Sequence, residues 1–299
     1  MRILVLGGTG YLGRHVAERL RALPGAHVLA AGRDASAEFA VDLAADRPDR
    51  LANTLAAAAP DAVVNCAGAT GGDTVTLAEV NARGPAVLCT ALREAAPTAR
   101  LVHLGSAAEY GPGIRDVPVP ESAPAGPVTP YGATKLAGTV AVTSAALDAV
   151  VLRVGNPVGP GAPVASLPGR LAALLATAGQ DPAAVLRLGD LSAHRDFVDV
   201  RDVARAVEYA VTVPAPLPPV LNISSGTALP VRELAHGLAR LAGFRGRLDE
   251  GTAGSARSAQ VSWQCSDVSA AARALGWRPA HSLDEALAAL WAAATEQVP

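Results

Sequence analysis

Short apolar runs alternate with amphipathic stretches along the first half of the chain. The runs cover residues 2–6, 27–31, 41–43, 62–65, 101–105 and 150–153. Runs of this length, bounded by glycine or polar residues, predict parallel strands that are buried on both faces. Helical patterns lie between them, for example at 14–22 and 75–95. This alternation predicts an α/β fold with a doubly wound parallel sheet of the Rossmann type.

The regular alternation ends after Gly161. The remaining elements that the pattern predicts are helices at 167–178 and 231–242, a short apolar segment at 185–188 and a strand at 220–223. We expect a dinucleotide-binding Rossmann domain at 1–160, to which 195–225 return, and a smaller interleaved substrate-binding lobe formed mainly by 161–299. Residues 114–130 carry many prolines and no periodicity, so they are predicted to form a loop over the carboxyl ends of the strands, where such folds bind ligands.

Composition narrows the class of protein. Half of the 299 residues are hydrophobic but only 3% are aromatic, so the core must consist mostly of alanine, valine and leucine. A net charge of -2 gives no electrostatic reason to expect nucleic acid or a membrane surface as a partner. No apolar run approaches the roughly 20 residues that span a bilayer. Three widely spaced cysteines form neither a disulfide framework nor a metal site, and we expect a cytoplasmic protein without a metal.

A glycine-rich turn follows the first predicted strand and opens the first predicted helix. It reads Gly7-Gly8-Thr9-Gly10-Tyr11-Leu12-Gly13, and Gly8, Gly10 and Gly13 match the spacing of the dinucleotide fingerprint. Glycines let the backbone approach a pyrophosphate, and the helix N-terminus offers N–H groups and a positive dipole end. The cofactor contacts that we predict in this turn are Gly7, Gly10, Tyr11, Leu12 and Gly13.

The residues after the next strands predict the rest of the cofactor site. Arg33 follows the second strand, where an arginine suits the 2′-phosphate of NADP and an acid suits the ribose of NAD. NADP(H) is therefore favoured, and the adjacent Asp34 leaves NAD(H) possible. Asp42 is a candidate adenine contact, with Leu43 beside it. Small residues after the fourth strand leave room for the cofactor ribose: Cys66, Ala67 and Gly68.

Lys135 is the only lysine among the 25 basic Lys and Arg residues, and it stands four residues after Tyr131. Thr129 and Pro130 are typical of an N-cap and a first helical position, so Tyr131 and Lys135 should share one face of a helix. A compact ammonium suits an approach to a phenol or a ribose hydroxyl better than a guanidinium does.

Several motifs in order resemble the extended short-chain dehydrogenase/reductase superfamily, in its NAD-dependent epimerase/dehydratase family. They are the glycine turn, NCAG at 65–68, Ser106 before Tyr110-Gly111, the Tyr131–Lys135 pair, NPVGPG at 156–161, RDFVDVRDVA at 195–204 and LGWRP at 275–279. Within the family, the motifs are most similar to those of NDP-4-keto-6-deoxyhexose reductases.

The resemblance implies roles for individual residues. Ser106 and Tyr131 would hydrogen-bond the substrate carbonyl, and Lys135 would hold the nicotinamide ribose and lower the pKa of Tyr131, since an adjacent ammonium favours a phenolate. Asn81 matches the asparagine that the superfamily carries on a helix near the cofactor. The residues that would bind the nucleotide diphosphate of a substrate are Asn156, Arg195 and Arg257. A homodimer formed through the helix at 132–147 is also implied.

The residues after Ser106 separate the possible reactions. A sugar 4,6-dehydratase needs an acidic pair directly after the hydroxyl residue, but Ala107 and Ala108 stand there, and Glu109 is expected to face away on a strand end. We therefore predict an NADPH-dependent 4-ketoreductase acting on an NDP-4-keto-6-deoxyhexose. The alternatives are an NDP-sugar C4 epimerase, a ketoreductase for a polyketide or another natural-product ketone, and a non-enzymatic NADP(H) sensor.

Overall fold

The computed structural model describes residues 1–214, 216–251 and 260–296. Within these residues, seven strands form a parallel sheet in the order β10-β6-β5-β4-β1-β2-β3. The strands are β1 (Arg2–Leu6), β2 (His27–Gly32), β3 (Phe39–Ala40), β4 (Ala62–Asn65), β5 (Arg100–Ser106), β6 (Ala149–Val154) and β10 (Val220–Ile223). The order reverses between β1 and β4, so the predicted doubly wound Rossmann fold is confirmed.

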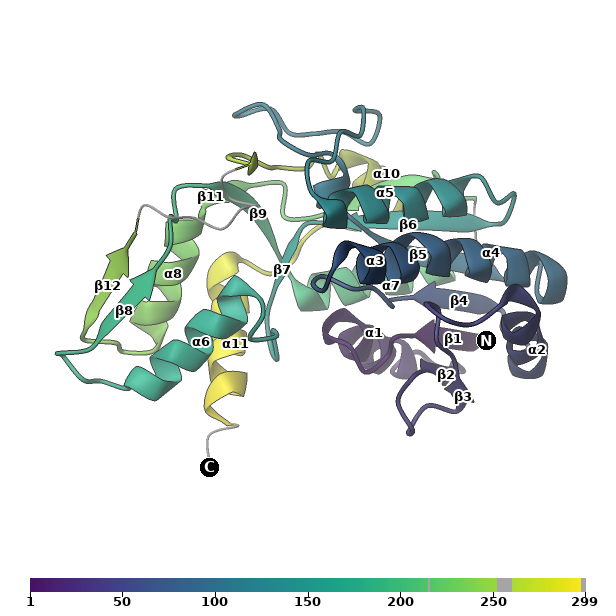
Figure 1. Cartoon of the computed structure of the whole chain (residues 1–299), viewed down its shortest axis with the longest axis horizontal. Coiled ribbons are helices and arrows are strands. Elements are labelled where there is room, and N and C mark those ends of the chain that lie inside the picture. Colours follow the sequence, from purple (N-terminus) through teal and green to yellow (C-terminus); the bar gives the residue numbers. More distant parts are fainter. Residues whose placement is uncertain (215, 252–259, 297–299) are drawn as a thin grey trace.

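Helices cover both faces of this sheet (Figure 1). On one face, α1 (Tyr11–Arg21) packs beside α7 (Val200–Thr212), and Trp277, which follows α10 (Ser269–Leu275), is fully buried in the same core. On the other face lie α2 (Pro48–Ala58), α4 (Gly84–Ala95) and α5 (Pro130–Thr143). Both cores consist mainly of valine, leucine and alanine, as the composition predicts.

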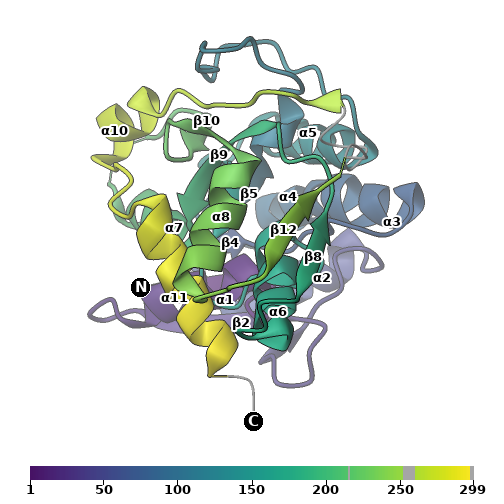
Figure 2. The ribbon, with the colours of Figure 1, turned by 90° about the vertical axis from the view of Figure 1, so that its left-hand side faces the viewer.

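A smaller lobe stands at one end of the sheet (Figures 1 and 2). Its helices α6 (Leu167–Ala178), α8 (Val231–Leu241) and α11 (Leu283–Thr295) pack on one another, with the parallel pair β8 (Val185–Leu188) and β12 (Arg247–Glu250) beside them. A three-stranded sheet of β7 (Asn156–Val158), β9 (His194–Asp199) and β11 (Ala228–Pro230) adjoins the lobe. The segments of the lobe are therefore interleaved with those of the Rossmann part along the chain.

Several local predictions are wrong. The third strand is Phe39–Ala40 and not 41–43, because Asp42 caps a turn in which its carboxylate accepts from the Ala44 N–H. The helix predicted at 14–22 begins at Tyr11, and the helix predicted at 132–147 ends at Thr143. Residues 156–158, for which no strand was predicted, form the short strand β7, which pairs with the distant β9.

The helix predicted at 75–95 is divided. It consists of α3 (Thr74–Ala78), a π-helical turn η1 (Glu79–Arg83) and α4. The wide turn carries Asn81, whose buried side chain bonds the backbone of a different loop. A π-turn inside a helix commonly marks a functional position, and no hydrophobic periodicity reveals one in advance.

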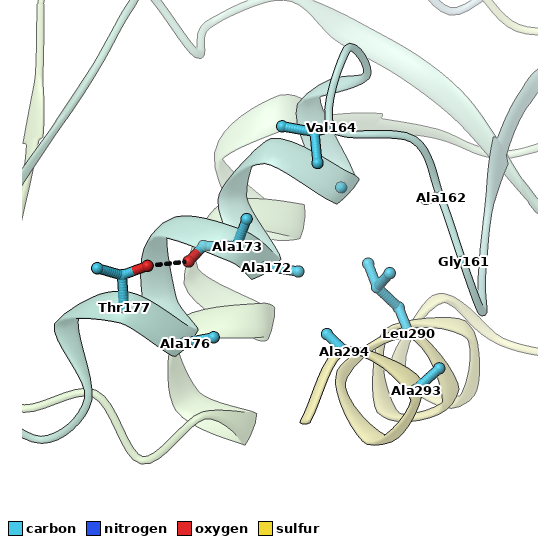
Figure 3. Close-up of a pocket in the computed structure, with 11 residues that line it drawn as sticks. Gly161, Ala162, Val164, Ala172, Ala173, Ala176, Thr177, Leu290, Ala293 and Ala294 are labelled. Atoms are coloured by element: carbon cyan, nitrogen blue, oxygen red, sulfur yellow. Dashed lines mark hydrogen bonds between the residues drawn. The ribbon is translucent and has the colours of Figure 1, made fainter. Parts of the chain in front are cut away.

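The lobe contains an apolar groove between α6 and α11 (Figure 3). It has a volume of about 320 Å³, and the side chains that line it are mostly small, among them Ala172, Ala173, Ala176, Leu290 and Ala293. None of the predicted site residues that the structure describes lines this groove. Among the described residues, no helix is long and apolar enough to cross a membrane, and no cluster of side chains could hold a metal ion.

Candidate active site

The glycine turn between β1 and α1 is built to receive an anion. Gly7 has a φ of +73°, and a Cβ there would lie 2.8 Å from the backbone of Ala67, so the turn requires glycine. Gly10 is the N-cap of α1, no described side chain caps this helix, and its first turn contains no acid. The backbone N–H groups of a helix N-terminus lack partners within the helix and fit a pyrophosphate. Here they belong to Tyr11, Leu12 and Gly13.

The end of β4 lies between this turn and the predicted catalytic lysine. Cys66, Ala67 and Gly68 follow β4 directly, and Ala67 contacts the Gly7 turn. A Cβ placed on Gly68 would lie 3.9 Å from Lys135 Nζ. The fold thus brings three of the predicted cofactor segments together, although they are more than 50 residues apart in sequence.

The first turn of α5 holds Tyr131 against the end of β5. Thr129 caps the helix, since its Oγ1 accepts from the Gly132 N–H at 3.1 Å, and Pro130 lies in the first turn, both as predicted. A Cβ on Gly132 would lie only 2.5 Å from the carbonyl oxygen of Ala108. The half-buried Tyr131 therefore sits on a helical turn that packs directly on the turn after Ser106.

Ser106 ends β5 and caps the 3-10 turn η2 (Ala107–Glu109). Its Oγ accepts from the Ala108 N–H at 3.1 Å, and its own N–H donates to Glu109 Oε1 at 2.7 Å. A hydroxyl that accepts in this way keeps its proton for donation to another acceptor. The Ser106 hydroxyl thus retains a proton that it can donate to a further acceptor.

Lys135 is 5% exposed and lies between α5 and the sheet. Its Nζ donates to the carbonyl oxygen of Leu104 at 2.5 Å. Burial lowers the pKa of Lys135 to about 8, while the negative charge of Glu109 acts in the opposite direction. Burial also raises the pKa of the Cys66 thiol to about 12 and lowers the pKa of His103 well below its usual value. At neutral pH Lys135 is accordingly an ammonium beside two neutral side chains.

Asn81 connects the π-turn to the loop after β4. Its Oδ1 accepts from the Ala69 N–H at 2.9 Å, and its Nδ2 donates to the Ala69 carbonyl at 2.8 Å and to Thr134 Oγ1 at 3.3 Å. These bonds fasten the loop after Gly68 to α5. In the structure the side chain of Asn81 therefore supports the loop after β4 by bonding the backbone of that loop.

The two charged residues after β2, Arg33 and Asp34, differ in the hydrogen bonds that they make. The exposed Asp34 accepts from both the backbone and the hydroxyl of Ser36, and these bonds lower its pKa. Arg33 is exposed, and it makes no hydrogen bond or ion pair with the described residues. Asp42 follows β3 and is partly buried, and the adjacent Leu43 is buried.

Two of the predicted diphosphate contacts, Asn156 and Arg195, lie on the sheet that adjoins the lobe. Asn156 begins β7 and donates to the Asp196 carbonyl at 3.1 Å. Arg195 on β9 is buried, and its guanidinium donates to the His194 carbonyl at 2.8 Å. Since Asn156 pairs with Phe197 and side chains alternate along a strand, Asn156 and Arg195 share one face of this sheet. Arg257 lies outside the described residues.

Glu109 and Arg153 were not among the predicted site residues. We expected Glu109 to lie on a strand end and to face away, but it lies in η2. Its carboxylate points into the core and pairs with the guanidinium of Arg153 at 2.8 Å. A local signal was present, because Ser106 and Glu109 have the spacing of a capping box. The pairing with Arg153, 44 residues away, has no such signal.

Comparison with known proteins identifies the family of the chain. Residues 3–224 match the NAD dependent epimerase/dehydratase family. The chain belongs to this family. It is also 40% identical, over 98% of its length and 95% of the relative's, to a dTDP-6-deoxy-L-talose 4-dehydrogenase (NAD(P)(+)) of Kitasatospora kifunensis.

Solved structures of other proteins share the whole fold of this chain. RMD from Pseudomonas aeruginosa complexed with NADPH has a TM-score of 0.84 at 25% identity, and 99% of each chain is covered. MoeE5 in complex with UDP-glucuronic acid and NAD has a TM-score of 0.86 at 26% identity, and both chains are covered completely. With the glycine turn described above, these findings make the chain an NAD(P)-dependent enzyme of the oxidoreductase type.

Proposed function

We propose that this enzyme reduces the 4-keto group of a nucleotide-activated 4-keto-6-deoxyhexose, with dTDP as the nucleotide. The observation that carries the proposal is the turn after Ser106. Ala107 and Ala108 offer only methyl groups there, and both oxygens of Glu109 are bonded, to the Ser106 N–H and to Arg153. Dehydration requires acid/base groups at this place, whereas hydride transfer requires only a proton donor. The relative named as a sugar 4-dehydrogenase supports the C4 position and the dTDP nucleotide.

The residues of this chain have separate roles in the proposed reaction. When it is bound, NADPH supplies the hydride for the sugar C4. Tyr131 donates its phenolic proton to the carbonyl oxygen, and the Ser106 hydroxyl hydrogen-bonds the same oxygen, so that an alcohol and NADP⁺ result. Lys135, charged at neutral pH, stabilises the phenolate that remains on Tyr131 and holds the nicotinamide ribose.

Asn156 and Arg195 are the proposed diphosphate contacts. They share one face of the β7-β9-β11 sheet, and a guanidinium forms bidentate, charge-assisted bonds with phosphate oxygens. NADPH is the preferred cofactor in this proposal, because Asp34 is held by Ser36 while Arg33 extends from the end of β2. A homodimer formed through α5 remains a prediction. The exposed Val140 on that helix is an apolar side chain that such a contact would cover.

The proposal is tested by following NADPH oxidation with dTDP- and GDP-linked 4-keto-6-deoxyhexoses and with a panel of bulky aromatic ketones. We expect turnover with the dTDP keto-sugar and little with the free ketones. Turnover of ketones but of no keto-sugar would overturn the proposal and favour a natural-product ketoreductase. Interconversion of C4-epimeric NDP-sugars without net NADPH consumption would identify an epimerase instead.

A further inference from the structure

Glu109 occupies a space that the strand next to it leaves open. Its side chain is fully buried. A Cβ on Gly105 would lie 2.8 Å from Glu109 Oε1 and 2.7 Å from a methyl group of Val151. The carboxylate therefore fills the position that a side chain at residue 105 would take, on the face of the sheet that α5 covers.

Two bonds fix this carboxylate. Oε1 accepts from the Ser106 N–H at 2.7 Å, and Oε2 accepts from Arg153 Nε at 2.8 Å. Arg153 is also buried, and its guanidinium lies 4.4 Å from the centre of the Tyr110 ring. The Tyr110 hydroxyl in turn donates to Asn222 on β10 at 2.8 Å. Glu109 is consequently the link between the backbone of Ser106 and a rigid network across three strands.

Lys135 shares this buried layer. The ionisable side chains that interact electrostatically with it are Glu109 in η2, Cys66 at the end of β4 and His103 on β5. Arg153 on β6 pairs with Glu109, Tyr131 stands one turn earlier on α5, and the π-turn presents the neutral Asn81. Cys66 and His103 are neutral at neutral pH, for the reasons given above. Among the described neighbours, Glu109 exerts the largest charge effect on Lys135, and it favours the ammonium.

We propose that Glu109 is a positioning residue for the reaction: it holds the Ser106 backbone in place and supplies the buried negative charge that keeps Lys135 an ammonium. The inference deepens the proposed function, since the ammonium is useful only if Tyr131 donates a proton. It also gives a reason for a fully buried ion pair at a place where an apolar pair would serve stability equally well.

Because Lys135 is the only lysine in the chain, its charge can be measured directly. Protein labelled with ¹³C at lysine Cε gives one lysine signal, and its titration reports the pKa of Lys135 without any substrate. Glu109→Gln should lower this pKa by about one unit or more, because the loss of a nearby opposite charge disfavours the ammonium. Glu109→Asp keeps the charge and should leave the pKa close to the wild-type value.

Glu121→Gln is a matched control. Glu121 also accepts from a backbone N–H, that of Asn222 at 2.8 Å, but it is not one of the charges that act on Lys135. This variant should leave the titration unchanged. If Glu109→Gln does not fold, the double variant Glu109→Gln with Arg153→Gln replaces both buried charges by neutral amides. The pKa of Lys135 should still be lower than in the wild type, because Glu109 has the largest charge effect on Lys135.

An unchanged or raised pKa of Lys135 in every folded variant that lacks the Glu109 charge would overturn the proposal. In the reductase assay, Glu109→Gln should also shift the alkaline limb of kcat to lower pH, whereas Glu109→Asp should lower kcat through Ser106 without that shift. The two proposals fail separately. A wild-type enzyme that reduces no keto-sugar refutes the proposed function, while the lysine titration still decides the role of Glu109.

Discussion

Two buried carboxylates support the two halves of the site in different ways. Glu109, in the turn η2 after Ser106, pairs with a buried cation and lies near a second one. Asp196, on β9, accepts hydrogen bonds from neutral groups of the described residues, among them the N–H and hydroxyl of Ser225, the N–H of Gly226 and the N–H of Ser266. Both are at most 1% exposed.

The difference shows what each half requires. In the cofactor half, burial disfavours the charge on Lys135, and the carboxylate of Glu109 acts in the opposite direction. Around Asp196, three chain segments that are distant in sequence meet: β9, the turn at Ser225 and Gly226, and the segment at Ser266. Neutral hydrogen bonds to one carboxylate hold such segments without adding a second ion. Glu109 acts mainly on the charge of Lys135, whereas Asp196 mainly holds three chain segments together.

The largest expected effect is on the chemistry of the cofactor half. Tyr131→Phe should reduce kcat of the proposed reduction by about 10²–10⁴-fold, since it removes the proton donor, while NADPH affinity stays nearly unchanged. Steady-state kinetics and a cofactor titration measure the two quantities. Tyr209→Phe, on α7 across the sheet, should alter neither. Loss of cofactor binding in Tyr131→Phe would mean that the tyrosine has a structural role.

Asp196→Ala should lower the free energy of unfolding by at least about 3 kcal/mol, because several buried donors lose a charged acceptor. Urea unfolding measures this. The matched control is Asp34→Ala, which removes an exposed carboxylate that also accepts two hydrogen bonds and should change stability by only about 0.5 kcal/mol. Equal effects of the two substitutions would show that Asp196 does not hold the sheet together.

The stability of the cofactor half should depend on pH through Lys135. Its pKa is about 8 in the folded protein, below the ordinary value of 10.5, so the unfolded chain binds more protons between these values. The contribution of Lys135 to stability therefore rises as pH rises through this window and is lost as pH falls through about 8. Relative to Lys135→Met, the wild type should gain about 2 kcal/mol between about pH 8 and pH 10 in urea unfolding. A pH-independent difference would contradict the buried ammonium.

The smallest effect concerns the choice of cofactor. Arg33→Ala should weaken NADPH binding by about tenfold, the loss of one exposed charge-assisted contact, and should leave NADH binding nearly unchanged. Fluorescence titration with both cofactors measures this. Arg245→Ala, which removes another exposed arginine on the lobe, should affect neither. Equal losses for the two cofactors would refute the assignment of Arg33 to the 2′-phosphate.

Most of the sheet could be predicted from the sequence because each strand is a short apolar run that is buried on both faces. β1, β4 and β10 have the predicted bounds, and so does helix α6. β3 and β7 could not be predicted, because two or three residues carry no periodicity and their pairing partners decide whether they are strands. The π-turn at Asn81 was hidden for a related reason, since a distant loop supplies the bonds that its side chain makes.

The sequence by itself determined the glycine turn, the cap at Thr129 and the spacing of Tyr131 and Lys135, because a few neighbouring residues are sufficient for each of these features. Only the tertiary structure decided that Glu109 faces inward, that it meets Arg153, and that Lys135 lies buried in the same layer. The charge on a buried group depends on its desolvation and on charges brought close by folding. Neither quantity is contained in local sequence, so the chemistry of Lys135 is set by residues that sequence patterns alone do not connect to it.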